Sequence, residues 1–373
     1  MNKNSKIYIA GHMGLVGSAL LQNLQKKGYA NLLTRTHQEL DLVDCDSVAE
    51  FFAKEKPEYV FLAAAKVGGI KANATYRADF IYKNLMIQNN VIHQCYLQKV
   101  KKLMFLGSTC IYPDNCEQPI KEEYLLTGTL EYTNEPYAIA KIAGIKMCES
   151  YNLQYGTNFI AAMPTNLYGP GDNFNLENSH VLPALLRKFH LGVAILNDSW
   201  EDIRNNLQRF PIEGISAKSS KDEILKVLNS KGIHFENGKV KIEIWGSGKP
   251  LREFLHNKDM AEACVYLMNH VDFTDIIKDF NPKEIRNTHI NIGSGKEISI
   301  KELSLLIAEI VGYKGELLYN SNKLEGTFRK LTDVSKLSEL GWTSKIALRE
   351  GINLFYKWYK KEFQKMKEVR QDQ

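Results

Sequence analysis

The 373-residue sequence contains no apolar run of the roughly 18 residues that a membrane-spanning helix needs. The polar segment Met1–Lys6 leads directly into an expected strand, so we expect no signal peptide. The six cysteines form no Cys-x-x-Cys pair, which argues against a zinc site or a disulfide framework. Most of them are expected to be buried thiols. These absences predict a cytoplasmic protein without a bound metal.

A strong charge of one sign is also missing. The chain has 48 Lys and Arg against 43 Asp and Glu, a net charge of +5, and the lysines are scattered. This mild excess could favour an anionic ligand but is no signature of a nucleic-acid-binding protein. The hydrophobic content of 44% and the charged content of 24% are typical of globular proteins.

A glycine loop follows an expected short strand at Lys6–Ala10. Gly11-His-Met-Gly-Leu-Val-Gly17 is succeeded by an amphipathic pattern at Ser18–Lys27, which predicts a helix. Strand, glycine loop and helix in this order are typical of a dinucleotide site, because the backbone can approach the pyrophosphate at the helix N-terminus. The spacing is Gly-x-x-Gly-x-x-Gly and not the commoner Gly-x-Gly-x-x-Gly. The residues expected to contact the cofactor here are Gly11, Gly14, Leu15, Val16 and Gly17.

The expected second strand, Asn31–Thr34, lacks a carboxylate at its end. Such a carboxylate would bind the ribose hydroxyls of NAD, whereas Arg35 and His37 follow here. This difference favours NADP(H). Asp41 and Leu42 begin the next turn and are expected beside the adenine, and the small residues Ala63, Ala64 and Ala65 close the strand at 57–65 and would let a cofactor pass.

The chain is organised around the stretch from Gly107 to Lys141. Tyr137 and Lys141 are four residues apart in a helical pattern, so their side chains lie one turn apart on one face. A neighbouring ammonium favours the phenolate, so we expect a lowered Tyr137 pKa and proton exchange with a carbonyl or alcohol oxygen. Ser108 could hold the same oxygen. The alternative is an ordinary exposed pair on a helix.

Strands and helices alternate through the first half of the chain. This alternation predicts an α/β fold of Rossmann type, with a doubly wound parallel sheet. We expect the cofactor domain at 1–165, completed by about 256–292, and a smaller α/β substrate domain at 166–255 and 293–373. The segment at about 192–239 is polar, charged and weakly patterned, with enough apolar residues to pack on the body.

Five stretches together resemble the extended short-chain dehydrogenase/reductases and, within them, the GDP-L-fucose synthase family. They are 63–70, 107–113, 133–144, 163–170 and the pair 245–248 with 252–256. The resemblance covers nearly the whole chain except about 192–239, which it implies is an insertion in the substrate domain.

The resemblance implies a GDP-linked 4-keto-6-deoxy sugar as substrate and NADPH-dependent 3,5-epimerisation and 4-reduction, giving GDP-L-fucose. A C4 ketone acidifies the hydrogens at C3 and C5, so one group removes a proton and another returns it on the opposite face. By resemblance, Cys110 is the base and His180 the acid. Tyr137 protonates the C4 oxygen, Ser108 stabilises that oxygen, and Lys141 holds the nicotinamide ribose.

Further contacts are implied by the same resemblance. Additional cofactor contacts would come from Leu106, Gly107, Pro164, Asn166, Leu167 and His180, besides Tyr137 and Lys141. Substrate contacts would come from Ser108, Asn166, Lys188, Trp245 and Arg252. Without the resemblance, Cys110 reads as a small buried residue, His180 as a packing residue at a helix start, and Trp245 equally well as core.

The sequence departs from the family pattern at three places. Met13 and His37 stand where relatives commonly carry arginines that grip the 2′-phosphate of NADP, which weakens the expected preference. The insertion at 192–239 is either a neutral surface excursion or a change of the sugar pocket for a larger substrate such as a GDP-linked heptose.

Other functions remain open at this point. A C4 reductase of a GDP-4-keto-6-deoxy-heptose would need neither Cys110 nor His180, and their presence favours the bifunctional enzyme. A UDP-sugar 4-epimerase would keep NAD bound and would not need Cys110 and His180 either. A cofactor-sensing regulator would not need Tyr137. By analogy we also expect a homodimer, through a four-helix bundle of the helices beginning at Ala78 and Tyr137.

Overall fold

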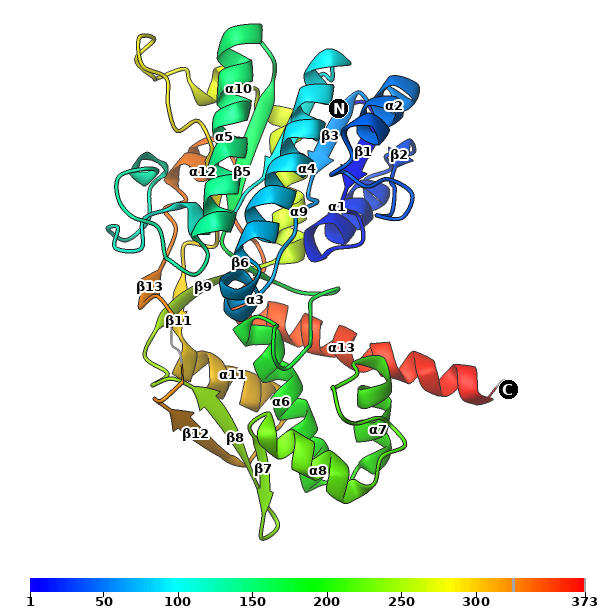
Figure 1. Cartoon of the computed structure of the whole chain (residues 1–373). Helices are drawn as coiled ribbons and strands as arrows, with labels where there is room; N and C mark the ends of the chain where they lie inside the picture. Colours follow the sequence, from blue (N-terminus) through cyan, green and yellow to red (C-terminus); the bar gives the residue numbers. More distant parts are fainter. Residues whose placement is uncertain (324–325, 372–373) are drawn as a thin grey trace. The chain divides into compact units, whose positions relative to one another are not determined.

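The computed structural model describes residues 1–323 and 326–371 (Figure 1). The chain divides into two compact units. Unit 1 comprises Met1–Leu167, Glu253–Lys296 and Leu331–Ile346, and unit 2 comprises Tyr168–Arg252, Glu297–Lys330 and Ala347–Gln373. The domain boundaries expected from the sequence stay a prediction.

Unit 1 is built on a six-stranded parallel sheet. Its strand order is β10-β5-β4-β3-β1-β2. The strands are β1 (Ile7–Ala10), β2 (Leu32–Leu33), β3 (Tyr59–Leu62), β4 (Lys102–Leu106), β5 (Phe159–Pro164) and β10 (Ile290–Ile292). Parallel strands of this order require helical crossovers, so the predicted Rossmann-type fold is confirmed.

Helices cover both faces of this sheet. Alternate residues of β1 enter different cores: Ile7 and Ile9 pack in one, Tyr8 and Ala10 in the other. The first core is closed by α1 (Leu15–Lys26), α9 (Asn257–His270) and α12 (Ser335–Glu339), and the second by α2 (Cys45–Glu55), α4 (Arg77–Leu97) and α5 (Glu135–Tyr155). Both faces of the sheet are therefore covered by helices and excluded from water. This explains why the sequences of its strands are continuous apolar runs.

Several shorter elements of unit 1 lie in the connections. The expected loop at 66–69 is followed by a short helix that the sequence did not suggest. These elements are α3 (Ile70–Thr75), η1 (Thr109–Ile111), η2 (Glu122–Tyr124) and α10 (Phe273–Ile276).

Unit 2 combines helices with short sheets. Its helices are α6 (Val181–Leu196), α7 (Trp200–Arg209), α8 (Lys221–Ser230), α11 (Ile300–Val311) and α13 (Leu348–Gln371). In one sheet β8 (Lys239–Trp245) runs parallel to β12 (Glu316–Asn320) and antiparallel to β7 (Ile233–Glu236). Unit 2 also contains β11 (Glu297–Ser299) and β13 (Arg329–Lys330), whereas β6 (Asn166–Tyr168) and β9 (Leu251–His256) each include a unit boundary of the chain.

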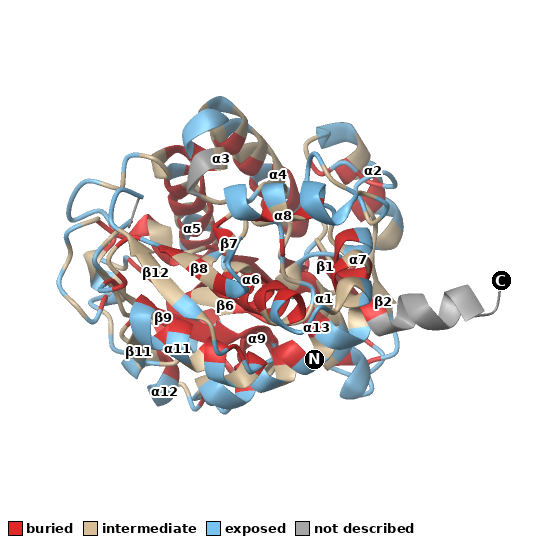
Figure 2. Ribbon diagram, turned by 90° about the horizontal axis from the view of Figure 1, so that it is seen from below, coloured by how far each residue is buried: buried red, intermediate tan, exposed pale blue. Residues whose placement is uncertain are grey.

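The insertion at 192–239 is folded into unit 2. It forms the end of α6, then α7, α8 and β7, of which only α8 was expected. As predicted, its apolar residues pack inside, because Ile203, Leu207, Ile224 and Leu228 are buried. Figure 2 marks the buried residues of the chain in red. The fully buried Arg187 on α6 also donates to Asn206 Oδ1 of α7 at 3.1 Å. The segment is thus part of the unit 2 core.

The cysteines differ from the expectation that most are buried. Cys95, Cys148 and Cys264 are buried, Cys110 and Cys116 are half-buried, and Cys45 is exposed at the start of α2. Among the described residues, no helix combines the length and apolar character needed to cross a membrane.

Candidate active site

The glycine loop between β1 and α1 brings backbone from two strands close together. Gly11 has a φ of +83°, and a Cβ there would lie 2.7 Å from the Ala64 nitrogen, at the end of β3. A Cβ on Gly17 would lie 2.1 Å from the Gly11 carbonyl oxygen. Side chains at these two positions would therefore push the loop away from β3 and α1 away from the loop.

The start of α1 suits an anion. Gly14 is the N-cap and has no side-chain capping bond, and the first turn carries no acidic residue. The first amides of a helix have no acceptor within it, and their dipoles favour negative charge. The loop with Leu15 and Val16 in this turn therefore fits the pyrophosphate of a dinucleotide.

The residues after β2 offer little uncompensated positive charge. Arg35 Nη2 is 2.8 Å from Glu55 Oε1, and its Nη1 donates to the Thr34 carbonyl oxygen. His37 is exposed and its Nδ1 lies 3.7 Å from Asp41 Oδ1. Met13 is 74% exposed and brings no charge.

Ser108 and Cys110 lie in the turn that follows β4. The Ser108 Oγ caps η1 by accepting from the Cys110 amide at 3.4 Å, and both side chains are half-buried. A Cβ on Gly107, just before them, would lie 2.3 Å from Met163 Sδ of β5, so the Met163 side chain would have to move. Functional side chains commonly lie at this carboxyl edge of a parallel sheet.

Helix α5 carries Tyr137 and Lys141. It begins after Asn134 with Glu135 and Pro136, residues that favour a helix start, and Gly144 allows it to approach β4. A Cβ on Gly144 would lie 2.4 Å from the Phe105 ring. Lys141 Nζ donates to the Leu106 carbonyl oxygen at 2.8 Å and lies 5.7 Å from the Tyr137 ring centroid.

The pKa values contradict one expectation. Desolvation, with a smaller contribution from Cys110, raises the pKa of Tyr137, whereas we expected Lys141 to lower it. Burial lowers the pKa of Lys141 to about 8, although negative charge on Cys110 opposes this shift. The Lys141 ammonium bonds to the Leu106 carbonyl oxygen, and its charge does not outweigh the desolvation of the Tyr137 hydroxyl. Tyr137 is thus a protonated hydroxyl at neutral pH, suited to donating a proton.

Four of the predicted catalytic residues therefore lie together in unit 1. The pKa values of Tyr137 and Lys141 both respond to the charge on Cys110. Ser108 is hydrogen-bonded to the Cys110 backbone. The combination supplies a hydroxyl donor, a thiol, a cation and a second hydroxyl at one strand end.

The other predicted site residues belong to unit 2 or to its junction. His180 is the N-cap of α6 without a side-chain capping bond, and desolvation lowers its pKa. Lys188 lies on α6, about two helical turns after His180. It is buried, and its Nζ donates to the Glu243 carbonyl oxygen at 3.1 Å. Burial lowers its pKa to about 8.

Two further predicted substrate residues flank the turn between β8 and β9. Trp245 is 51% exposed, which contradicts its interpretation as a core residue. Lys323 Nζ stands 5.5 Å from the Trp245 ring centroid, a cation that sequence reasoning missed because it lies 78 positions further along the chain. Arg252 donates to the Leu251 carbonyl oxygen, and desolvation lowers its pKa.

Asn166 and Asp172 lie on either side of the unit boundary. Asn166, with Pro164 and Leu167 beside it, leaves the end of β5, and its Nδ2 donates to the Glu253 carbonyl oxygen at 2.8 Å. Asp172 was not predicted. Its buried Oδ2 has no hydrogen-bond partner among the described residues, and burial raises its pKa to about 7.

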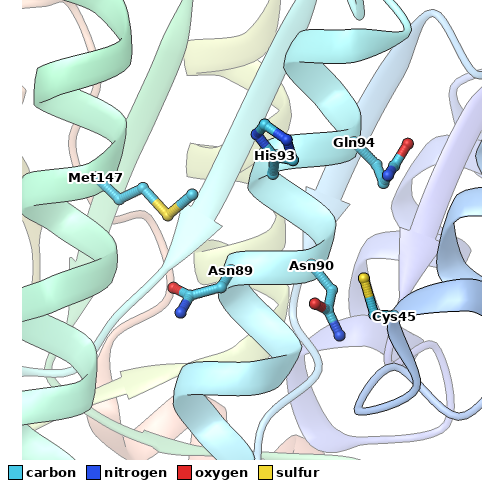
Figure 3. A pocket seen from close by; sticks show the side chains of 6 residues that line it. All are labelled: Cys45, Asn89, Asn90, His93, Gln94 and Met147. Carbon is cyan, nitrogen blue, oxygen red and sulfur yellow. The ribbon is translucent and has the colours of Figure 1, made fainter.

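A separate hollow of about 350 Å³ opens on unit 1 (Figure 3). Side chains from the start of α2, from α4 and from α5 line it: Cys45, Asn89, Asn90, His93, Gln94 and Met147. None of these residues is a predicted site residue, so this hollow is distinct from the Ser108–Tyr137 cluster.

Comparison with known proteins gives the family. Residues 7–204 and 214–293 match the model of the NAD dependent epimerase/dehydratase family. GDP-L-fucose synthase 1 of Arabidopsis thaliana is 49% identical over 360 residues, covering 96% of this chain and 94% of that protein.

Two solved structures from Campylobacter jejuni are equally similar. A GDP-6-OMe-4-keto-L-xylo-heptose reductase is 50% identical with a TM-score of 0.89, covering 97% of this chain and 99% of that one. A GDP-mannoheptose C4 reductase with NADP bound is 49% identical with a TM-score of 0.84, covering 96% and 99%. Identity alone therefore does not separate synthases from reductases. The resemblance found in the motifs is confirmed, and the chain is an enzyme that belongs to the NAD dependent epimerase/dehydratase family, among the relatives of GDP-L-fucose synthase.

Proposed function

We propose that this enzyme converts GDP-4-keto-6-deoxy-D-mannose to GDP-L-fucose by 3,5-epimerisation followed by NADPH-dependent reduction at C4. The observation that carries the proposal is the cluster of Ser108, Cys110, Tyr137 and Lys141 at the end of β4. A pure reductase needs Ser108, Tyr137 and Lys141 but gains nothing from a thiol beside them.

In the reduction, Tyr137 is the proton donor. NADPH, when bound along the glycine loop, supplies the hydride that reaches C4. Tyr137 gives its hydroxyl proton to the C4 oxygen as the C–O double bond becomes a single bond, and its raised pKa keeps that proton available. Ser108 donates a hydrogen bond to the same oxygen, and the Lys141 charge stabilises the tyrosinate that remains.

In the epimerisation, Cys110 and His180 are the groups that remove and return a proton. Cys110, as thiolate, removes the proton from C3 or C5, and the electron pair is delocalised onto the C4 oxygen as an enolate. His180, as imidazolium, returns a proton to the opposite face of the same carbon. The lowered pKa of His180 makes its cation a stronger acid than an ordinary imidazolium.

NADP(H) is the cofactor that the relatives favour. The C4 reductase related to this chain at 49% identity has NADP bound in its structure. The unpaired α1 N-terminus and the close approach at Gly11 fit a dinucleotide pyrophosphate here. Because Arg35 is paired with Glu55 and Met13 is uncharged, we expect weaker discrimination against NAD than two free arginines would give.

The deciding experiment follows the substrate carbons. Purified enzyme is mixed with NADPH and GDP-4-keto-6-deoxy-mannose in D2O, and the product is identified by NMR. GDP-L-fucose with deuterium at C3 and C5 supports the proposal. A product reduced at C4 without deuterium at these carbons would contradict it and leave a reductase only.

A second candidate is a C4 reductase of a GDP-4-keto-6-deoxy-heptose. Two observations favour it: the equal identity to two GDP-heptose reductases, and the insertion built into unit 2 through Arg187 and Asn206. NADPH consumption with the heptose substrate, and none with the hexose, would establish this candidate. Retention of Cys110 would then need another explanation.

A homodimer in the cytoplasm completes the proposal. Helices α4 and α5 pack on each other, and large apolar residues on them are exposed: Tyr82, Leu97, Ile139, Leu153 and Tyr155. A second copy of the chain packed against them would remove this surface from water. Light scattering of the purified protein, with Tyr155→Glu as the variant expected to dissociate, tests this assembly.

A further inference from the structure

The turn that carries Ser108 and Cys110 is weakly bonded to itself. Within it, Ile111 N is 3.3 Å from the Ser108 carbonyl oxygen and Tyr112 N is 3.5 Å from the Thr109 carbonyl oxygen. Both distances lie beyond the range of strong amide hydrogen bonds. A turn of three residues with such bonds does not fix its own position, so other contacts must hold it.

Tyr112 supplies those contacts. Its side chain is 3% exposed, and its hydroxyl is 2.5 Å from Asn291 Oδ1 and 2.9 Å from His289 Nε2. Both partners lie in or beside β10, at the edge of the sheet and two strands away from β4. The turn is therefore tied to a strand that is about 180 residues distant in sequence.

The hydrogen positions in this group follow from the acceptors. Asn291 Oδ1 can only accept, so the Tyr112 hydroxyl donates to it. That hydroxyl then accepts from His289 Nε2–H, so a neutral His289 has its proton on Nε2 and none on Nδ1. Burial, together with the charges of Lys336 and Lys146, lowers the pKa of His289, in agreement with a neutral ring.

The same strand holds the rest of the loop. Asn291 Nδ2 donates to the Ile120 carbonyl oxygen at 2.9 Å, and the Asn291 amide donates to Glu122 Oε1 at 2.9 Å. Lys336 of α12 donates to the carbonyl oxygen of His289, the residue before β10, at 2.8 Å. Asn291 thus binds the loop at three points between Tyr112 and Glu122.

We propose that Tyr112, His289 and Asn291 are positioning residues that hold the Ser108–Cys110 turn in place through a buried hydrogen-bond network anchored on β10. The chemical role of the turn rests on the proposed function, whereas the placement of the turn can be measured without substrate. None of the three touches the reacting atoms in this proposal. They act through the backbone that joins Tyr112 to Cys110.

The test uses the thiols as reporters. In Tyr112→Phe the ring is kept and only the hydroxyl is lost, so the variant keeps its packing while Asn291 and His289 lose a partner. Wild type and variant are alkylated with iodoacetamide, and each cysteine is followed by mass spectrometry. We expect Cys110 to react severalfold faster in the variant, because the turn is released, while the exposed Cys45 on α2 keeps its rate. An unchanged Cys110 rate would overturn the proposal.

The buried thiols show whether the variant has merely unfolded. Cys95, Cys148 and Cys264 are buried and stay protected if the change is local. If these buried thiols also react in Tyr112→Phe, a pair of variants at His289 tests the proposal instead. His289→Gln keeps an N–H donor for the Tyr112 hydroxyl and should leave Cys110 at the wild-type rate, whereas His289→Leu removes the donor and should accelerate it. Equal rates in this pair would overturn the proposal.

Kinetics give an independent reading. We expect Tyr112→Phe to lower kcat by about tenfold or more, since small misplacements of catalytic groups have effects of this order, and to leave the KM for NADPH unchanged. Tyr137→Phe should lower kcat by about 10²- to 10⁴-fold without changing Cys110 alkylation. If the proposed substrate is wrong, wild type and variants all lack activity, but the alkylation difference persists.

Discussion

The two halves of the unit 1 cluster are held in different ways. Tyr137 and Lys141 lie one turn apart on the continuous helix α5, which Gly144 allows to pack closely on β4. Ser108 and Cys110 lie on a short turn whose own bonds are long and whose position depends on Tyr112 and β10. Residues placed by a helix are positioned locally, whereas residues placed by a turn depend on contacts that are distant in sequence.

The largest expected effect tests the helix half. Tyr137→Phe removes the proton donor, and we expect kcat to fall by about 10²- to 10⁴-fold, the range of general acid catalysis. NADPH affinity, followed by fluorescence titration, should be kept. Tyr151→Phe on the same helix is the control, since that hydroxyl bonds to His93. Full turnover in Tyr137→Phe would instead support a cofactor-sensing protein.

The next effect tests the turn half. Cys110→Ser replaces the thiolate with a far weaker base, so deuterium incorporation at C3 and C5 should fall by about 10²-fold or more. Cys116→Ser is the matched control, because Cys116 lies six positions away in the same loop. Exchange that survives in Cys110→Ser, or is lost in Cys116→Ser, would remove Cys110 from the role of base.

A smaller effect is expected from a substitution in unit 2. Lys188→Met removes a buried cation expected to meet the GDP phosphates, and GDP affinity measured by calorimetry should fall about tenfold, a typical value for one charge-assisted hydrogen bond. Lys188 has a pKa of about 8, so it is charged below that pH and loses its charge above it. Wild-type affinity should therefore weaken as pH rises through 8. The exposed Lys226→Met is the control, and a GDP affinity in Lys188→Met equal to wild type would exclude Lys188 from the site.

The smallest effect is a shift in pH dependence. The pKa of Lys141 is about 8, so its ammonium is present at lower pH and is lost as pH rises through that value. If the charge assists Tyr137, the reduction rate declines above pH 8. Lys141→Arg keeps a cation at high pH and should move this decline upward, whereas Lys146→Arg on the same helix should not. An unmoved decline would assign it to another group.

The sequence predicted what a single element or a short motif contains. The glycine loop, the Tyr137–Lys141 spacing and the alternation of strands gave the Rossmann-type sheet and the family, because each signal is complete within about ten residues or repeats along the chain. The strands β7 and β12 are only four and five residues long and were missed. The helix α7 was also missed, although Trp200, Ile203 and Leu207 recur at helical spacing in it.

Desolvation was the main physical quantity that the sequence could not supply. Spacing alone indicated that Lys141 would lower the pKa of Tyr137, but the ammonium bonds to the Leu106 carbonyl and burial raises that pKa. Likewise, the burial of Asp172 and the position of Lys323 over the Trp245 ring depend on segments that meet only after folding.

By itself, the sequence determined the fold class, the family and which residue types are available for the chemistry, since these follow from local pattern and motif order. Only the tertiary structure decided how the insertion at 192–239 is used and what holds the Ser108–Cys110 turn. Buried hydrogen bonds such as those of Arg187 and Tyr112 join residues that are 19 to 179 positions apart. Their geometry is set by packing of the whole unit, and no periodicity along the chain records it.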